Sequence, residues 1–113
     1  MLDKINRLTQ DKEFDNVFKL GRASYSQILG IKTAANKKSN SRFGVLISTK
    51  ISKKAVARNK LKRQIREIIQ SQITKIKPGY DIVVITFPLI IKADYKKLEK
   101  TINQNLKKLS LYK

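Results

Sequence analysis

The chain has 113 residues and is strongly basic: 26 lysines and arginines stand against 8 aspartates and glutamates, which gives a formal charge of +18. It contains no histidine and no cysteine, so imidazole bases, thiolate nucleophiles, metal ligands of either type and disulfides are all excluded. The length fits one domain with a real core, and the 41% of hydrophobic residues exclude a basic disordered tail. We therefore expect one folded domain over residues 1–113.

The excess positive charge indicates a polyanionic partner, because each lysine or arginine placed on a phosphate releases a condensed counterion. Nucleic acid is the expected partner, while an anionic membrane surface and acidic proteins are the alternatives. The N-terminus lacks an apolar segment of signal-peptide length, and the longest apolar stretch, 82–91, is too short to span a bilayer. We expect a cytoplasmic protein with no membrane partner and no obligate protein partner.

The first predicted element is a helix over residues 9–20. Phe14, Val17 and Phe18 recur at helical spacing, and Gly21 is well placed to end the helix. Acidic residues lie near its start, where the helix dipole favours negative charge. We interpret them as first-turn residues rather than metal ligands: Asp11, Glu13 and Asp15.

Three later segments are typical of strands: 25–33, 43–47 and 80–87. A short extra strand is expected near Lys50. The polar loop 36–41 between the first two is typical of a hairpin connection. The third strand is apolar throughout, as in a strand buried on both faces. A turn at Pro78 and Gly79 precedes it.

Two more helices follow from the spacing of apolar residues. The second covers about 54 to 74 and buries one stripe, Leu61, Ile65, Ile68 and Ile69, which Ile73 would extend. The third starts at Tyr95 with Asp94 as its N-cap and buries a similar stripe: Leu98, Ile102, Leu106 and Leu109. The order of elements is α-β-β-(β)-α-β-α. It predicts a small α+β sandwich with helices packed on a mainly antiparallel sheet.

The second helix carries the most informative charge pattern. With about 100° of turn per residue, its apolar stripe lies beside an arc of roughly 140° that holds four cations and one amide. These are Arg58, Asn59, Lys62, Arg63 and Arg66. Most charged helix faces are merely solvated, but such faces mix both signs, and here only Glu67 lies at the edge of the arc. The pattern favours binding to a polyphosphate.

The run Arg58-Asn59-Lys60-Leu61-Lys62-Arg63-Gln64-Ile65-Arg66-Glu67 resembles the signature of the bacterial ribonuclease P protein family, which reads R-N-x-x-K-R-x-x-R-E. The stretches before and after it also resemble that family, over nearly the whole chain. Three positions depart from the family's usual pattern: Lys60 replaces an arginine, Thr49 a lysine, and Ile31 an aromatic residue.

The resemblance implies that the chain is not itself the catalyst. In this family the catalyst is an RNA, which uses Mg²⁺ that it binds itself to remove the 5′ leader of precursor tRNA. The resemblance also implies a left-handed crossover through the signature helix. No cofactor is expected on the protein alone, and the partners implied are the catalytic RNA and the precursor tRNA.

Two RNA-binding surfaces are implied. The signature helix would contact the catalytic RNA through Arg58, Asn59, Lys60, Lys62, Arg63 and Arg66. A cleft between the first helix and the sheet would hold the single-stranded leader through Phe14 and Phe18, since aromatic faces stack on any base. Packing in the core is the alternative for both phenylalanines. Four cations are expected around this cleft, each of which could equally be only solvated: Arg7, Lys12, Lys50 and Lys54.

Other functions remain open from composition alone. The chain could be a ribosomal protein or assembly factor that binds structured RNA without processing it. It could also bind DNA with residues 55–70 as a recognition helix. A helix lying on a membrane surface is less favoured, because the apolar stripe is needed for the core.

Overall fold

The structure, a computed structural model, describes residues 4–113. Within them it has three α-helices, four strands and three short 3₁₀ segments. In chain order these are η1 (Lys4–Asn6), α1 (Asp11–Leu20), β1 (Arg22–Tyr25), β2 (Leu29–Ala35), β3 (Arg42–Leu46), α2 (Ala55–Gln70), η2 (Ile73–Lys75), β4 (Tyr80–Thr86), η3 (Pro88–Lys92) and α3 (Tyr95–Lys108). The prediction of a small α+β domain is confirmed.

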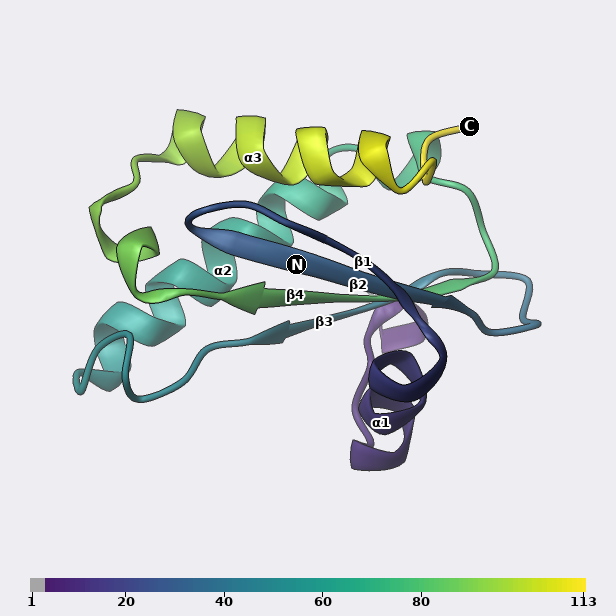
Figure 1. Cartoon of the computed structure of the whole chain (residues 1–113), viewed down its shortest axis with the longest axis horizontal. Helices are drawn as coiled ribbons and strands as arrows, with labels where there is room; N and C mark the ends of the chain where they lie inside the picture. Colours follow the sequence, from purple (N-terminus) through teal and green to yellow (C-terminus); the bar gives the residue numbers. More distant parts are fainter. Residues whose placement is uncertain (1–3) are drawn as a thin grey trace.

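The strands form one mixed sheet in the order β1-β2-β4-β3 (Figure 1). The β1–β2 and β2–β4 pairs are antiparallel, and β3 runs parallel to β4. The sheet is therefore mainly antiparallel, as predicted. Its central strand β4 has Ile82, Val83 and Val84 fully buried, as its unbroken apolar sequence indicates.

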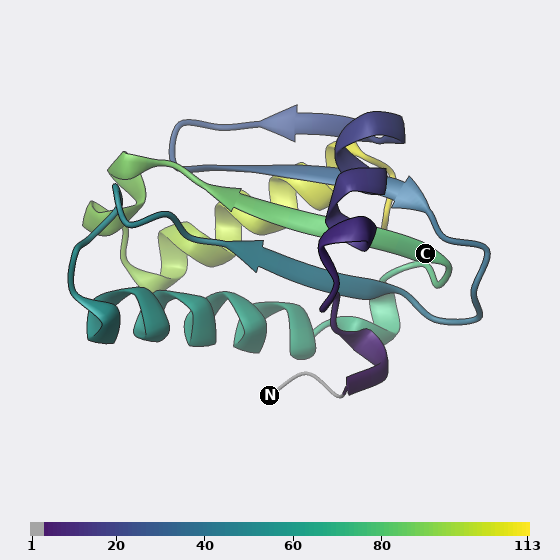
Figure 2. The ribbon, with the colours of Figure 1, turned by 90° about the horizontal axis from the view of Figure 1, so that it is seen from below.

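The parallel pair requires the chain to cross over the sheet between β3 and β4, and α2 makes this connection. In Figure 2 both strands point the same way, and α2 lies on the side of the sheet away from α1. Moving from β3 to β4 over that side gives a left-handed crossover. Such connections are right-handed in about 98% of cases, so only the family resemblance predicted this hand.

Two details of the predicted sheet are wrong. The loop 36–41 closes no hairpin, because β4 lies between β2 and β3. The hairpin joins β1 to β2 instead, where the N–H of Ser26 donates to the carbonyl of Leu29 at 2.8 Å. The extra strand is β1, and Lys50 lies in a turn at 49–51. The predicted strand 25–33 is thus the end of one strand, a turn and most of the next.

The two faces of the sheet carry different helices, because side chains alternate along each strand. Helices α2 and α3 cover one face and enclose the main core with residues such as Ile31, Phe43 and Ile82. Helix α1 covers part of the other face, where Val17 packs with Val83 in a smaller cluster. Figure 2 shows that α1 crosses only one end of its face and leaves the rest of the sheet uncovered.

The helix predictions hold with small shifts at the ends. Helix α2 stops at Gln70 rather than near residue 74, and η2 continues the chain. Asp94 caps α3 as predicted, since its Oδ1 accepts from the N–H of Lys97 at 2.8 Å. Gly21 ends α1 in an extended conformation, and its Cβ position is blocked by the carbonyl oxygens of Val17 and Thr33. Close packing, not a positive φ, therefore requires glycine there.

Candidate nucleic-acid interface

The outer side of α2 holds most of the predicted signature residues together. Asn59, Lys62, Arg63 and Arg66 line one shallow hollow with Glu67 at its edge. Asn59 and Arg63 are exposed, while Lys62 and Arg66 are half-buried. We call these four residues the α2 cationic surface. Three cations against one carboxylate leave it with a net positive charge.

Arg7 adds a fourth cation to this surface. The segment that carries it runs along the β3 edge, where Arg7 forms a parallel bridge with Phe43 and the N–H of Leu8 donates to the Phe43 carbonyl at 2.8 Å. Burial and then the positive field of Arg7 lower the pKa of the Arg66 guanidinium below its ordinary value. Arg7 therefore lies near Arg66, and its predicted role around the leader cleft stays a prediction. Within residues 4–113 neither guanidinium is paired with a carboxylate.

The other two signature residues lie apart from the α2 cationic surface. Arg58 is half-buried, and its Nη1 donates to the carbonyl of Ser52 at 2.7 Å, which ties the start of α2 to the preceding turn. Lys60 is exposed and lies with Arg58 around a second hollow, between α2 and the start of α3. The helical spacing predicts this position for Lys60, which falls outside the arc of the other cations, but not for Arg58, which belongs to that arc.

The structure separates the two phenylalanines of α1. Phe14 is half-buried and packs in the small cluster with Val17 and Val83. Its ring occupies the space where a Cβ of Gly44 would be, so Phe14 packs on the sheet, and a contact of this ring with the leader stays a prediction. Phe18 remains 39% exposed, and the Lys32 ammonium lies 5.1 Å from the centre of its ring. Of these two rings, that of Phe18 is the more accessible.

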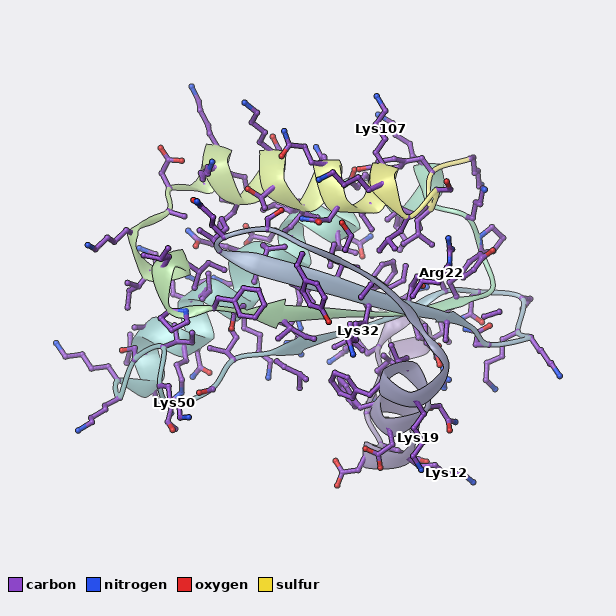
Figure 3. The ribbon with its side chains drawn as sticks, viewed as in Figure 1. Lys12, Lys19, Arg22, Lys32, Lys50 and Lys107 are labelled. Atoms are coloured by element: carbon purple, nitrogen blue, oxygen red, sulfur yellow. The ribbon has the colours of Figure 1, made fainter. Side chains whose placement is uncertain are left out.

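The predicted cations around the cleft do not come together. Figure 3 shows Lys12 pointing away from the sheet at the far end of α1, and Lys50 at the opposite end of the molecule. Lys54 is the N-cap residue of α2. All three are exposed, and their predicted role around the leader stays a prediction.

Other residues take up the uncovered part of the sheet, and the sequence analysis missed them. Tyr25 is 56% exposed and lies over Gly30, where no room is left for a Cβ. The ring of Phe87 lies 6.3 Å from that of Tyr25, centre to centre, at an angle of 39°. Together with Phe18 and Lys32 these rings form what we call the open sheet face.

Lys32 is absent from the predicted leader site because the residue compared with the family's aromatic position was its neighbour, Ile31. Ile31, the position compared with an aromatic residue of the family, is fully buried in the main core. Its neighbour Lys32 points to the other face, as Figure 3 shows, because side chains alternate along a strand. Correct strand boundaries would have assigned Lys32 to the open sheet face.

One network of ion pairs fixes α1 to the sheet. The Arg42 guanidinium donates two hydrogen bonds to Asp81, at 2.8 and 2.7 Å, and pairs with Glu13 of α1. Glu13 also accepts from the N–H groups of Thr9 and Gln10, at 3.1 and 3.0 Å. Burial acts to raise the pKa of the Glu13 carboxyl, but these two N–H groups and Arg42 hold it below its ordinary value.

The carboxylates of α1 are arranged for stability. Asp11 and Glu13 lie in the first turn as predicted, whereas Asp15 lies beyond it. Among residues 4–113 no three acidic side chains gather where they could hold a metal ion. The expectation that Mg²⁺ is held by RNA stays a prediction. No helix in this part of the chain is both long enough and apolar enough to cross a membrane.

The fold and these surfaces define a class: a small, highly basic α+β domain with a cationic helix on one side and exposed aromatic rings on an open sheet face. The family model for ribonuclease P matches residues 2–110. The chain therefore belongs to the family of ribonuclease P protein subunits.

Individual relatives agree with this assignment. The ribonuclease P protein component of Synechocystis sp. is 38% identical over 104 residues, which cover 91% of this chain and 84% of the relative. The structure of the Staphylococcus aureus RNase P protein is similar with a TM-score of 0.89 and 26% identity, covering 96% of this chain and 98% of that one. The Thermotoga maritima protein gives a TM-score of 0.82 and 30% identity, covering 90% and 96%.

Proposed function

We propose that this chain is the non-catalytic, RNA-binding subunit of ribonuclease P. It binds the catalytic RNA through the α2 cationic surface and the single-stranded 5′ leader of precursor tRNA through the open sheet face. The RNA holds the Mg²⁺ ions and cleaves the leader. The observation that carries the proposal is the set of cations on α2, which within residues 4–113 share their hollow with one carboxylate, Glu67, and lie with Arg7 in a chain of this family.

The α2 cationic surface suits a folded RNA. Arginine forks can make bidentate contacts with phosphate oxygens, and the Asn59 amide can both donate and accept. Burial and then the positive charge of Arg7 lower the pKa of Arg66, so both disfavour its charged form, and a bound phosphate would favour that form. The RNA thus supplies the negative charge that the protein surface lacks.

The open sheet face suits a single strand of variable sequence. Phe18 and Tyr25 are accessible rings of the kind on which bases stack, and stacking does not depend on base identity. The Lys32 ammonium lies 5.1 Å from the centre of the Phe18 ring and can attract a phosphate. A duplex has no unstacked base to offer such rings, which favours the leader over the mature part of the tRNA.

Reconstitution with a bacterial ribonuclease P RNA at low Mg²⁺ tests the proposal. We expect the protein to stimulate cleavage of precursor tRNA and to bind precursor more tightly than mature tRNA. Arg63→Ala should weaken binding of the catalytic RNA and reduce the slope of log affinity against log salt by about 0.7 to 0.9, since one phosphate contact is lost. Lys107→Ala is the matched control, because this exposed lysine lies in the last turn of α3 and does not line the hollow of the α2 cationic surface (Figure 3).

Two results would contradict the proposal. Equal affinity for precursor and mature tRNA, with no stimulation of cleavage, would instead support a ribosomal or assembly role. An Arg63→Ala slope equal to that of Lys107→Ala would remove α2 from the RNA interface.

A further inference from the structure

A hollow of about 300 Å³ lies between the first half of α2 and the segment that joins η3 to α3. Its floor is apolar and is made by Ile51, Leu61 and Ile90, of which Ile90 is 1% exposed. Its rim carries Arg58, Lys60, Gln64, Tyr95 and Asp94, whose carboxylate caps α3 by accepting from the N–H of Lys97. This hollow is separate from both the α2 cationic surface and the open sheet face.

The rim combines one aromatic ring with a few polar groups. Tyr95 is 39% exposed, although it is the first residue of a helix whose apolar stripe is otherwise buried. The Arg58 guanidinium is fixed by its bond to the Ser52 carbonyl, and the Gln64 amide is able both to donate and to accept. An apolar floor with a small number of placed polar groups is typical of a pocket for a small flat molecule.

The surroundings favour a nucleobase as that molecule. Arg58 and Lys60 belong to the same helix as the α2 cationic surface, so an RNA bound there would continue over the hollow. Proteins that read RNA accept unstacked bases on aromatic rings and guanidinium planes and bind their polar edges with amide groups. Tyr95, Arg58 and Gln64 supply one group of each kind.

We propose that this hollow, walled by Tyr95 and floored by Ile51, Leu61 and Ile90, receives one unstacked base of the partner RNA. The inference rests on the proposed function, because it takes the RNA bound by α2 as the source of the base. It adds a contact that recognises RNA structure to a surface that otherwise attracts phosphates.

Three variants test the pocket without touching the phosphate contacts. Tyr95→Ala removes the stacking wall, Tyr95→Phe keeps it, and Ala57→Leu fills the hollow from the α2 side while leaving Tyr95 in place. Leu89→Ala is the matched control, because Leu89 is an exposed apolar residue of η3 that does not line the hollow. Affinity for a bacterial ribonuclease P RNA is measured for each at several salt concentrations.

Tyr95→Ala and Ala57→Leu are expected to lower the affinity about 5- to 150-fold, the range that loss of one stacked base gives. The salt slope should stay at the wild-type value, because no phosphate contact is lost. Tyr95→Phe and Leu89→Ala should bind like the wild type. Ultraviolet cross-linking of the wild-type complex should join the Tyr95 peptide to a single nucleotide.

Wild-type affinity in Ala57→Leu together with the absence of a Tyr95 cross-link would overturn the inference, even if Tyr95→Ala failed to fold. An equal loss in Leu89→Ala would also overturn it, since the effect would then come from η3 and not from the hollow. If the wild-type protein does not bind the RNA at all, the proposed function fails first, and that result is distinct from failure of the pocket alone.

Discussion

At the scale of single residues, Phe14 and Phe18 show how one sequence pattern can contain two roles. Both fall at helical spacing and both match the aromatic positions that the family resemblance assigns to the leader cleft. Phe14 packs against Gly44 and Val17, whereas Phe18 stays accessible above Lys32. Periodicity places both rings on the sheet side of α1. Periodicity does not show how far the sheet extends beneath α1, and the extent of the sheet decides which of the two rings is covered.

Substitution of each phenylalanine should separate stability from binding. Phe14→Ala should lower the free energy of unfolding by about 2 kcal/mol or more, because it leaves a cavity in the small cluster. Phe18→Ala should change it by less than about 1 kcal/mol, since surface substitutions usually have small effects. Phe18→Ala should also reduce affinity for precursor tRNA more than for mature tRNA.

Urea unfolding and paired binding measurements on precursor and mature tRNA would check both expectations. If Phe18→Ala destabilised the fold and left the ratio of the two affinities unchanged, Phe18 would be a core residue like Phe14.

At the scale of elements, the helices were more predictable than the strands. Apolar residues repeat over several turns in α2 and α3, and the same stripes are buried in the structure. Strand β1 has four residues and is mostly exposed, so it has no alternating pattern to detect. The parallel pairing of β3 with β4 could not be predicted either, because it depends on contacts between segments far apart in the chain.

Helix α2 begins in a way that stability alone does not explain. Its N-cap residue is Lys54, in the extended conformation that capping residues adopt, but no side chain caps the helix and its first turn has no acidic residue. Lys54→Ser should therefore raise the free energy of unfolding by about 1 kcal/mol through a new cap. It should also lower affinity for the catalytic RNA, because one cation near the signature is lost.

Lys53→Ser is the matched control for that change. It removes the same charge from the neighbouring exposed position but cannot cap the helix. Urea unfolding should show a higher free energy of unfolding for Lys54→Ser and not for Lys53→Ser. Salt titrations should show that Lys54→Ser binds the RNA with lower affinity than the wild type. Equal stability in the two variants would mean that the cap adds nothing and that any effect comes from the charge.

At the scale of the whole molecule, charge predicted the kind of partner but not where the cations lie. Composition and the cluster of arginines in one helix indicate a polyphosphate. The structure then adds Arg7 to the α2 cationic surface from a segment distant in sequence, and it places Lys12 and Lys50 at opposite ends of the molecule. Such groupings depend on tertiary packing, which a single sequence read for local periodicity does not contain.

The net charge also makes a prediction about the free protein. The molecule measures 36 × 27 × 24 Å and carries a formal charge of +18. At 0.01 M salt the Debye length is about 30 Å, so charges on opposite sides repel, whereas at 0.15 M it is about 8 Å and only neighbours interact. Among residues 4–113 the ion pairs are those of Arg42 with Glu13 and Asp81. Added salt therefore weakens few attractions between opposite charges, while it weakens the repulsion among many cations.

The free energy of unfolding should therefore rise as sodium chloride increases from 0.01 to 0.15 M, measured by urea unfolding at each concentration. The catalytic RNA should stabilise the protein further at fixed salt, by about 2.7 kcal/mol when it is present at 100 times its dissociation constant. Arg42→Ala provides a control for the attractive network: it should be less stable than the wild type at both salt concentrations and show the same rise. A fall in stability with added salt would show that ion pairs outweigh repulsion in this chain, and the surplus of cations would then not require a polyanion for relief.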